Sequence, residues 1–192
     1  MNSNKLSKLK DIVSLVVENE GNTSKTRLLK LLFIIDRESV KRFGHKIAGL
    51  EYRVWKMGPV QYDVYNNLSN DNGSFFSNIL KISYKDETCT LVRSIVENPK
   101  DNLSKNEIDL IKDIIKENQA TNTADLIDDL HQPGSLWRVT AENNGVYDKL
   151  ENGSITNTEL KIDFESLVSN DPLLLGIYKD SKEQEEIENI LS

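Results

Sequence analysis

The sequence predicts a mainly helical α+β fold, a single domain with a small antiparallel β-sheet. Apolar residues recur at three- and four-residue spacing in several segments, which is the period of a helix that buries one face. Residues 46–56 and 79–92 instead mix or alternate β-branched and aromatic residues with polar ones, as strands do. The length of 192 residues suits one ordinary core and is too short for two.

Two helices are predicted in the first 45 residues. The first is amphipathic and ends at Gly21, and the second follows the helix-start signal Thr23-Ser24. Residues 28–35 are apolar on nearly every side, so we interpret the second helix as the central buried helix, ending near Phe43-Gly44. We interpret the second helix as returning to the polar surface at Asp36, Arg37 and Glu38. The apolar positions of the first helix are Leu6, Leu9, Ile12, Val13, Val16 and Val17.

Residues 46–56 are predicted to be extended, either as a strand or as an irregular segment. Gly58 and Pro59 are predicted to end this segment and to begin a helix with proline at its first position. A polar stretch, residues 69–74, is expected to end that helix. Its apolar side carries Val60, Val64, Tyr65 and Leu68.

Residues 79–92 are predicted to form a two-stranded antiparallel ribbon. The first strand places alternate apolar residues on one face, and a polar turn follows at residues 85–88. The residues that alternate are Leu80, Ile82 and Tyr84 before the turn, and Cys89 and Leu91 after it.

Two further helices are predicted after the ribbon. Ser104 and Glu107 form a capping box, in which each side chain satisfies a free backbone amide at the start of a helix. A short helix is predicted from about Thr123, and Pro133 stops it.

Residues 141–192 are predicted to be an acidic extension. Residues 141–157 are rich in Asn and Gly without periodicity, so a loop is expected there. A helix is predicted to start at Asp171-Pro172 or nearer Ser181. Its narrow apolar stripe can dock within one chain or between two, so the sequence leaves the oligomeric state open. The stripe consists of Ile187, Ile190 and Leu191.

Charge is divided unevenly along the chain. Residues 1–60 hold 12 Lys and Arg against 6 Asp and Glu, a net charge of +6, whereas residues 61–192 hold 12 against 25, a net charge of −13. A basic face could meet an acidic partner or nucleic acid. The simpler interpretation is that the two parts neutralise each other in the folded protein.

The sequence lacks the features of membrane and exported proteins. No stretch approaches the roughly 18 consecutive apolar residues of a membrane span, and the N-terminus has no apolar core of a signal peptide. The single cysteine, Cys89, cannot form an internal disulfide and is interpreted as a small core or sheet residue. A reducing, cytoplasmic location is expected.

No sequence pattern is typical of catalysis or cofactor binding. His45 and His131 belong to no ligand pair, and neither a nucleophile motif nor a phosphate-binding glycine loop occurs. Asp36 and Glu38 point in different directions on a helix, so polar capping explains them better than acid–base chemistry. His131 is interpreted as a helix-terminal residue bonded to backbone, with a pH-sensitive ligand as the alternative. We predict no enzymatic activity, no metal and no cofactor.

Aromatic residues with basic neighbours form the one constellation that is typical of a binding surface. Trp, Tyr and Arg dominate the energy of protein interfaces, so a partner-binding patch is predicted. The same aromatic residues could instead form the core of the small sheet, and the sequence supports both interpretations. Nucleic-acid binding is disfavoured, because RNA-binding folds carry denser basic and aromatic arrays. The candidate residues are Tyr52, Arg53, Trp55, Lys56, Tyr62 and Tyr65.

Several short motifs occur in a fixed order between residues 24 and 140. They comprise Lys30, Leu31, Leu32 and Phe33 with Asp36, then Gly44, Ile47, Gly49 and Tyr52, then Met57, Gly58, Pro59 and Val60, and finally Leu103, Ser104, Glu107, Leu126, Leu130, His131, Trp137 and Arg138. In this order they resemble the Panacea domain of SocA-like antitoxins. Residues 1–140 are therefore assigned to that domain and residues 141–192 to the acidic extension, which carries no family pattern. Phe33 departs from the family, which often has Tyr there.

The resemblance implies a mostly helical fold and the role of antitoxin in a type II toxin–antitoxin system, often in phage defence. Such a protein neutralises a cognate toxin by direct protein–protein binding. The resemblance also implies an alternative, a proteolytic adaptor or regulatory binding protein that delivers the toxin to a protease. Neither role needs catalysis, and the aromatic patch and the tail helix are the candidate contact surfaces.

Overall fold

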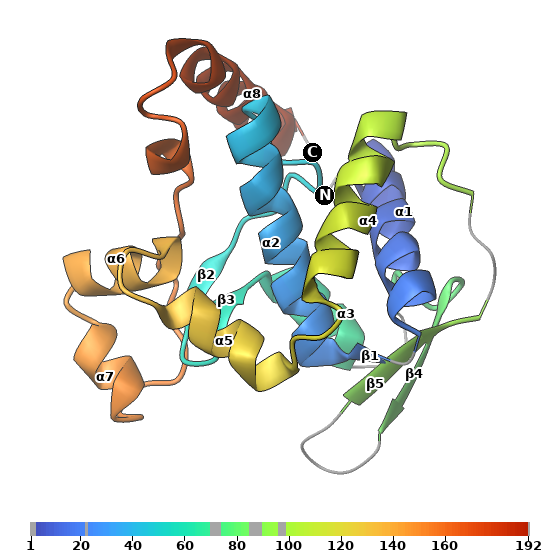
Figure 1. Cartoon of the computed structure of the whole chain (residues 1–192), viewed down its shortest axis with the longest axis horizontal. Coiled ribbons are helices and arrows are strands. Elements are labelled where there is room, and N and C mark those ends of the chain that lie inside the picture. Colours follow the sequence, from blue (N-terminus) through green and yellow to red (C-terminus); the bar gives the residue numbers. More distant parts are fainter. Residues whose placement is uncertain (1–2, 22, 70–73, 85–89, 96–98, 192) are drawn as a thin grey trace.

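Helix α2 (Lys25–Phe43) runs through the middle of the computed structural model, and the other helices pack around it (Figure 1). The structure describes residues 3–21, 23–69, 74–84, 90–95 and 99–191. Every side chain from residue 28 to residue 35 is buried, which confirms the predicted central helix. The Ser24 side chain accepts a hydrogen bond from the Arg27 N–H at its start, and Gly44 ends it in the left-handed conformation with φ 75°.

Helices cover α2 from two sides (Figure 1). On one side lie α1 (Ser3–Glu20) and α4 (Lys105–Asn118), which also contact each other. On the other side lies α5 (Thr123–His131), followed by α6 (Leu136–Asn143) and α7 (Tyr147–Glu151). Both hydrogen bonds of the capping box predicted at the start of α4 are present, so that prediction is confirmed.

One small antiparallel sheet has the strand order β1–β5–β4. Strands β4 (Leu80–Tyr84) and β5 (Thr90–Ser94) form the predicted ribbon, with Ile82 opposite Val92. No sequence pattern predicts strand β1 (Thr23–Ser24), which pairs with β5 just before α2 begins. The predicted turn at residues 85–88 and Cys89 lie outside the described residues, as do residues 70–73 of the stretch expected to end the following helix.

A second sheet pairs β2 (Arg53–Trp55) with β3 (Gly58–Val60), with Val54 opposite Pro59. The prediction that Gly58 and Pro59 begin a helix is therefore wrong. Gly58 has φ 90°, which lets the chain reverse tightly, and proline is tolerated at the edge of a sheet, where its missing N–H is not required. Helix α3 (Tyr62–Ser69) starts only afterwards, where the Gln61 side chain accepts a hydrogen bond from the Val64 N–H.

The loop expected over residues 141–157 is also wrong for most of its first half. Helix α6 continues to Asn143, and α7 follows after Gly145, which has φ 63°. Buried Ala141 and Leu150 anchor these short helices to the core. The Asn- and Gly-rich composition marks the turn between two helices rather than one long loop.

The acidic extension shares the core of the preceding residues. The Val54 N–H donates to the Leu160 carbonyl at 2.9 Å and the Ile162 N–H to the Tyr52 carbonyl at 2.9 Å, so this part of the extension lies along β2. Phe164 then packs against the rings of Phe33 and Tyr52, with centroids 5.4 and 5.9 Å away. The assigned boundary at residue 140 is thus crossed by a single hydrophobic core.

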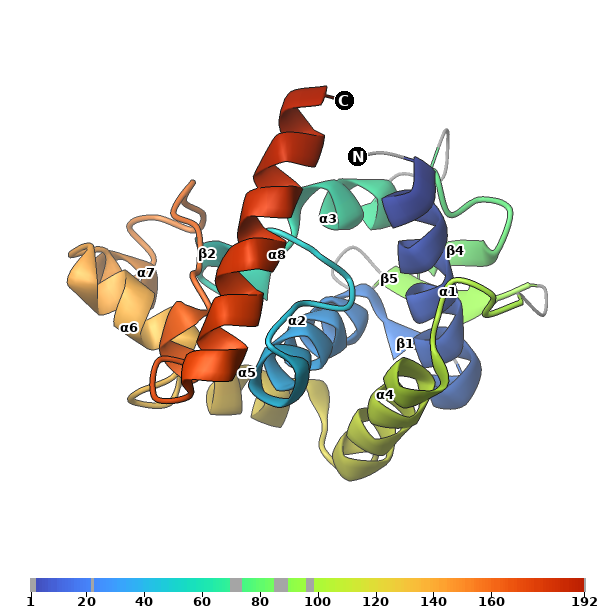
Figure 2. The same cartoon turned by 90° about the horizontal axis from the view of Figure 1, so that it is seen from above.

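After the short 3₁₀ helix η1 (Glu165–Leu167), helix α8 (Pro172–Leu191) completes the chain and crosses near the C-terminal end of α2 (Figures 1 and 2). The prediction of a helix from Asp171-Pro172 is confirmed. Buried Tyr178 docks it on the body, whereas Ile187 and Ile190 are 51% and 83% exposed. The predicted apolar stripe therefore does not dock within this chain, and the Leu191 side chain lies outside the described part.

Candidate functional site

Strand β2 and helix α3 bring most of the predicted aromatic and basic residues together. The Trp55 ring meets Tyr65 edge-on at 5.1 Å and Tyr62 at 6.3 Å between centroids. The Arg53 guanidinium lies 4.8 Å from the centre of the Tyr62 ring. We call Arg53, Trp55, Tyr62 and Tyr65 the aromatic patch.

Two predicted members lie elsewhere. Tyr52 is buried and is not a surface residue, because alternation along β2 turns it and Val54 toward the core. The ammonium group of Lys56 lies against Gly153, beyond α7. In the patch itself, Tyr62 is 42% exposed, and the other three residues are half-buried. The patch therefore combines a supported aromatic layer with one ring open to solvent.

A cleft of about 460 Å³ lies beside the aromatic patch. Its walls come from Arg53 and Tyr62, from the loop after α2, from residues 161–163 and from α8, so the two predicted contact surfaces meet there. Its basic and acidic side chains are equal in number. The basic residues are Lys5, Lys46, Arg53, Lys161 and Lys182, and the acidic residues are Glu51, Asp63, Asp163, Glu185 and Glu186.

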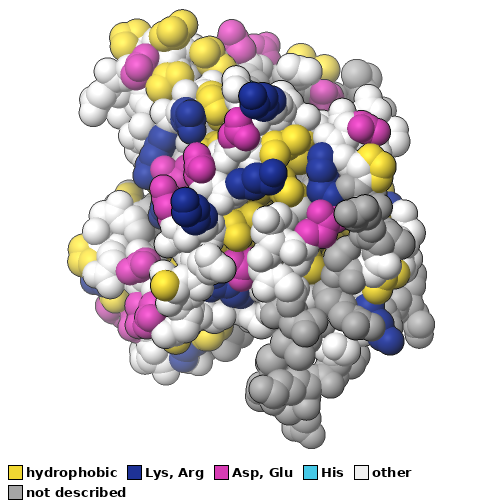
Figure 3. Space-filling view, turned by 45° about the vertical axis from the view of Figure 1, so that its right-hand side comes forward, with side chains coloured by type: hydrophobic (Ala, Val, Ile, Leu, Met, Phe, Trp, Pro, Cys, Tyr) yellow, Lys and Arg dark blue, Asp and Glu magenta, His cyan; other side chains and the backbone are white. Residues whose placement is uncertain are grey.

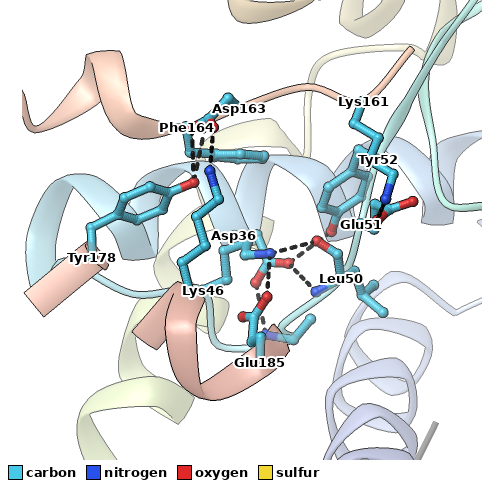
Figure 4. A network of polar contacts seen from close by, with 12 residues as sticks. Asp36, Lys46, Leu50, Glu51, Tyr52, Lys161, Asp163, Phe164, Tyr178 and Glu185 are labelled. Carbon is cyan, nitrogen blue, oxygen red and sulfur yellow. Dashed lines mark hydrogen bonds and ion pairs between the residues drawn. The ribbon is translucent and has the colours of Figure 1, made fainter. Parts of the chain in front are cut away.

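Ion pairs tie the walls of the cleft together. Lys46 contacts Glu185 of α8 at 2.9 Å, and Lys182 of α8 contacts Asp163 at 2.6 Å. The Tyr178 hydroxyl also donates to Asp163 at 3.0 Å (Figure 4). Helix α8 is therefore held in place by the buried Tyr178 ring, by Leu174 and Leu175 packed against the core, and by a set of polar contacts.

A buried carboxylate, Asp36, positions the loop that forms one wall (Figure 4). It accepts hydrogen bonds from the Ala48 N–H at 2.7 Å, the Leu50 N–H at 3.3 Å and the Tyr52 hydroxyl at 3.0 Å. Burial raises the pKa of Asp36 to about 6, although Lys46 and these hydrogen bonds oppose the shift. The interpretation of Asp36 as a polar surface or capping residue is wrong, because its carboxylate is buried and accepts hydrogen bonds from the backbone of a loop distant in sequence.

A second buried polar group, Lys30, holds the β2–β3 hairpin. Its ammonium donates to the Pro59 carbonyl at 2.9 Å, and burial lowers its pKa to about 7. Gly58 lies directly beside it, since a Cβ atom there would be 3.1 Å from the Lys30 nitrogen and 3.6 Å from the His131 Nε2. Only glycine leaves this close approach open.

His131 packs on Trp137 with ring centroids 3.8 Å apart. The expected hydrogen bond to backbone is not made by its Nε2, which is buried and has no partner within the described part of the chain. The Ser135 hydroxyl instead donates to the Leu130 carbonyl near the end of α5. Burial and nearby Lys30 lower the pKa of His131 to about 4. The ring beneath it is fixed in turn, since the Trp137 indole N–H donates to the Trp55 carbonyl at 2.9 Å.

The predicted family-motif positions therefore form buried supports for the patch and the cleft. They fix the hairpin and the loop on α2, and few of them face solvent. The buried positions are Lys30, Leu31, Leu32, Asp36, Gly58, Pro59, Val60 and Trp137, whereas Gly49, with φ 57°, approaches the Lys5 side chain.

Sequence reasoning missed Asp163, Tyr178 and Glu185. Their contacts join residues far apart in sequence, and no spacing rule connects them. The one available signal was a tyrosine, Tyr178, early in the acidic tail helix. Within the described ranges, no cluster of His, Cys, Asp and Glu is arranged to hold a metal ion, and no described helix is long and apolar enough to cross a membrane.

Fold and site together define a mainly helical α+β module with a partly exposed aromatic patch beside a charged cleft. Residues 28–138 match the family described as "Antitoxin SocA-like, Panacea domain". The match covers more than half of the chain, so this protein belongs to that antitoxin family, as the motifs predict. No curated protein and no solved structure matches the chain.

Proposed function

We propose that this protein is the antitoxin of a type II toxin–antitoxin system and neutralises its cognate toxin by direct binding at the aromatic patch and the adjoining cleft. Membership of the antitoxin family is the observation that carries the proposal. A role in phage defence and a cytoplasmic location belong to the same proposal.

The chemistry of the patch supports a protein partner. Arg, Trp and Tyr are the side chains most enriched among interface hot spots, and Tyr62 offers an exposed ring backed by Arg53. A stable interface buries roughly 800 Å² on each protein, so the patch requires the neighbouring cleft as additional contact area.

The charge distribution supports a protein partner over nucleic acid. Three basic residues of the first 60 pair with acidic residues of the remainder: Lys8 with Glu107, Lys46 with Glu185, and Arg53 with Glu159. On the face drawn in Figure 3, basic and acidic side chains are interspersed around hydrophobic ones. Phosphate backbones select a field of one sign, which this surface lacks.

Growth rescue tests the proposal. The chain would be co-expressed with the protein encoded by the neighbouring gene, whose expression alone should arrest growth. Wild type should restore growth and co-purify with the toxic protein. The Arg53→Ala/Trp55→Ala double variant should bind more weakly by about tenfold or more, since hot-spot residues contribute about 2 kcal/mol or more.

Arg138 provides a matched control. Its guanidinium lies 4.1 Å from the Tyr147 ring and pairs with Glu142, much as Arg53 lies over Tyr62 and pairs with Glu159. Arg138→Ala should leave rescue intact, and thermal melts should show both variants folded. Undiminished rescue by the folded Arg53/Trp55 variant would show that the patch is not the binding site.

The same assay separates neutralisation from delivery to a protease. Direct neutralisation predicts that the toxin persists in a stable complex in cells with or without their ATP-dependent proteases. An adaptor would instead make toxin levels fall only when the protease is present. Challenging cells that carry the intact gene pair with phage would test the proposed role in defence.

A further inference from the structure

Helix α8 has a face that the rest of the described chain leaves uncovered. At 3.6 residues per turn, Leu173, Ile187 and Ile190 fall on the side of the helix away from Tyr178, which docks it. They are 72%, 51% and 83% exposed. A surface helix normally turns its apolar residues toward the core, and here three large ones point away from it.

Acidic side chains border these apolar residues. Asp180 and Glu183 share the outer side of the helix, whereas Glu186 and Lys179, which pairs with Glu165, lie at its edge. The last turn of α8 has no basic residue. We call Leu173, Asp180, Glu183, Ile187 and Ile190 the outer face.

Two ion pairs with the rest of the described chain lie on the inner side of α8. Glu185 pairs with Lys46 there, and Lys182 pairs with Asp163. Viewed from above, the C-terminal half of α8 extends past the neighbouring elements (Figure 2). A partner can therefore approach the outer face without displacing any described contact that docks the helix.

We propose that the outer face of α8 docks into an apolar groove with a Lys- and Arg-rich rim on a partner protein. An amphipathic helix in a groove is a recurrent mode of recognition, and the acids of the outer face would meet the basic rim. A second copy of α8 fits poorly, because Asp180, Glu183 and Glu186 would face the same acids. The inference rests on the proposed function, in which this partner is the toxin.

Binding of the full chain to the purified co-expressed toxic protein tests the inference. Ile187→Ser/Ile190→Ser should raise the Kd by about tenfold or more, because it removes exposed apolar anchors. Asp180→Asn/Glu183→Gln should weaken binding at low salt and flatten its dependence on NaCl concentration. Matched controls are Val139→Ser, an exposed apolar residue on α6, and Asp109→Asn/Asp113→Asn on α4. Both controls should bind as wild type does.

Each result is decisive. If the Ile187/Ile190 variant is folded by circular dichroism and binds within twofold of wild type, the outer face is not the docking surface, while the proposed function stands. If wild type itself does not bind the toxic protein, both proposals fall. If light scattering shows wild-type dimers that Ile187→Ser/Ile190→Ser converts to monomers, the face belongs to a second copy and the inference is overturned.

Discussion

Replacing Lys30 with Met tests whether a buried lysine with a lowered pKa holds the β2–β3 hairpin. Burial lowers the pKa of this side chain from 10.5 to about 7. Between these two values the unfolded chain binds a proton that the folded protein does not. Stability must therefore rise with pH across this window, and Lys30→Met should abolish that rise.

The magnitude follows from the two pKa values. At pH 7 the folded amine is about half protonated, and at pH 9 it has lost nearly all of its proton, whereas the unfolded lysine keeps most of its proton at both. Integration over these two pH units gives wild type about 2 kcal/mol of additional stability. Lys30→Met also leaves the Pro59 carbonyl without its donor, which costs about 1–3 kcal/mol at every pH and leaves the slope unaffected.

Urea unfolding followed by tryptophan fluorescence at pH 7, 8 and 9 measures this slope. The free energy of unfolding of wild type should gain about 2 kcal/mol over Lys30→Met between pH 7 and 9. Lys112→Met, at an exposed lysine of α4, is the matched control and should follow wild type. Parallel curves for wild type and Lys30→Met would show that Lys30 keeps an ordinary pKa, and would refute the reasoning.

Further predictions concern the other buried supports. Asp36→Asn should lower the free energy of unfolding, measured in urea, by about 1–3 kcal/mol, because an amide cannot accept all three hydrogen bonds. A loss equal to that of Glu38→Gln would contradict this. Gly58→Ala should lower the free energy of unfolding by about 1–3 kcal/mol, since φ 90° and the nearby Lys30 nitrogen oppose a Cβ atom. Gly134→Ala, at φ 83° with open space around it, measures the cost of backbone strain without crowding. Phe164→Ala should lose about 3–5 kcal/mol in a single cooperative transition, and two separate transitions would show that the extension is not part of the core.

The free energy of unfolding at acidic pH depends on the protonation of His131. Its pKa is lowered from 6.5 to about 4 in the folded protein, so only the unfolded chain binds the proton between these values. Stability should fall as pH decreases through this window, and His131→Asn should fall less than wild type. Because Asp36 remains in both proteins, its own titration cancels in the comparison. Identical pH profiles for the two proteins would exclude this role of His131.

Elements with a local physical cause could be predicted from the sequence. The capping box at Ser104 and Glu107, the cap at Ser24 and the left-handed Gly44 act within a few residues, and all three lie where the pattern places them. The hairpin at Gly58 could not be separated from a helix start, because proline suits both the first turn of a helix and an edge strand. Only the pairing of Arg53 with Val60 decides between them.

Charged residues in the core mark the second limit of sequence reasoning. Lys30 and Asp36 belong to sequence motifs, yet composition assigns such residues to the surface. Their burial depends on the Pro59 carbonyl and on the Ala48 and Leu50 amides, which tertiary folding delivers.

The sequence by itself determined the mainly helical α+β class, the central helix and the antitoxin family, because helical periodicity, caps and motif order are local properties of the chain. Tertiary structure decided which aromatic residues are exposed, where the cleft lies and which face of α8 is left open. Tyr52 and Tyr62 look alike in sequence, but the Tyr52 hydroxyl donates to Asp36 in the core, whereas the Tyr62 ring faces solvent beside Arg53. That difference arises from long-range packing, which no local pattern records.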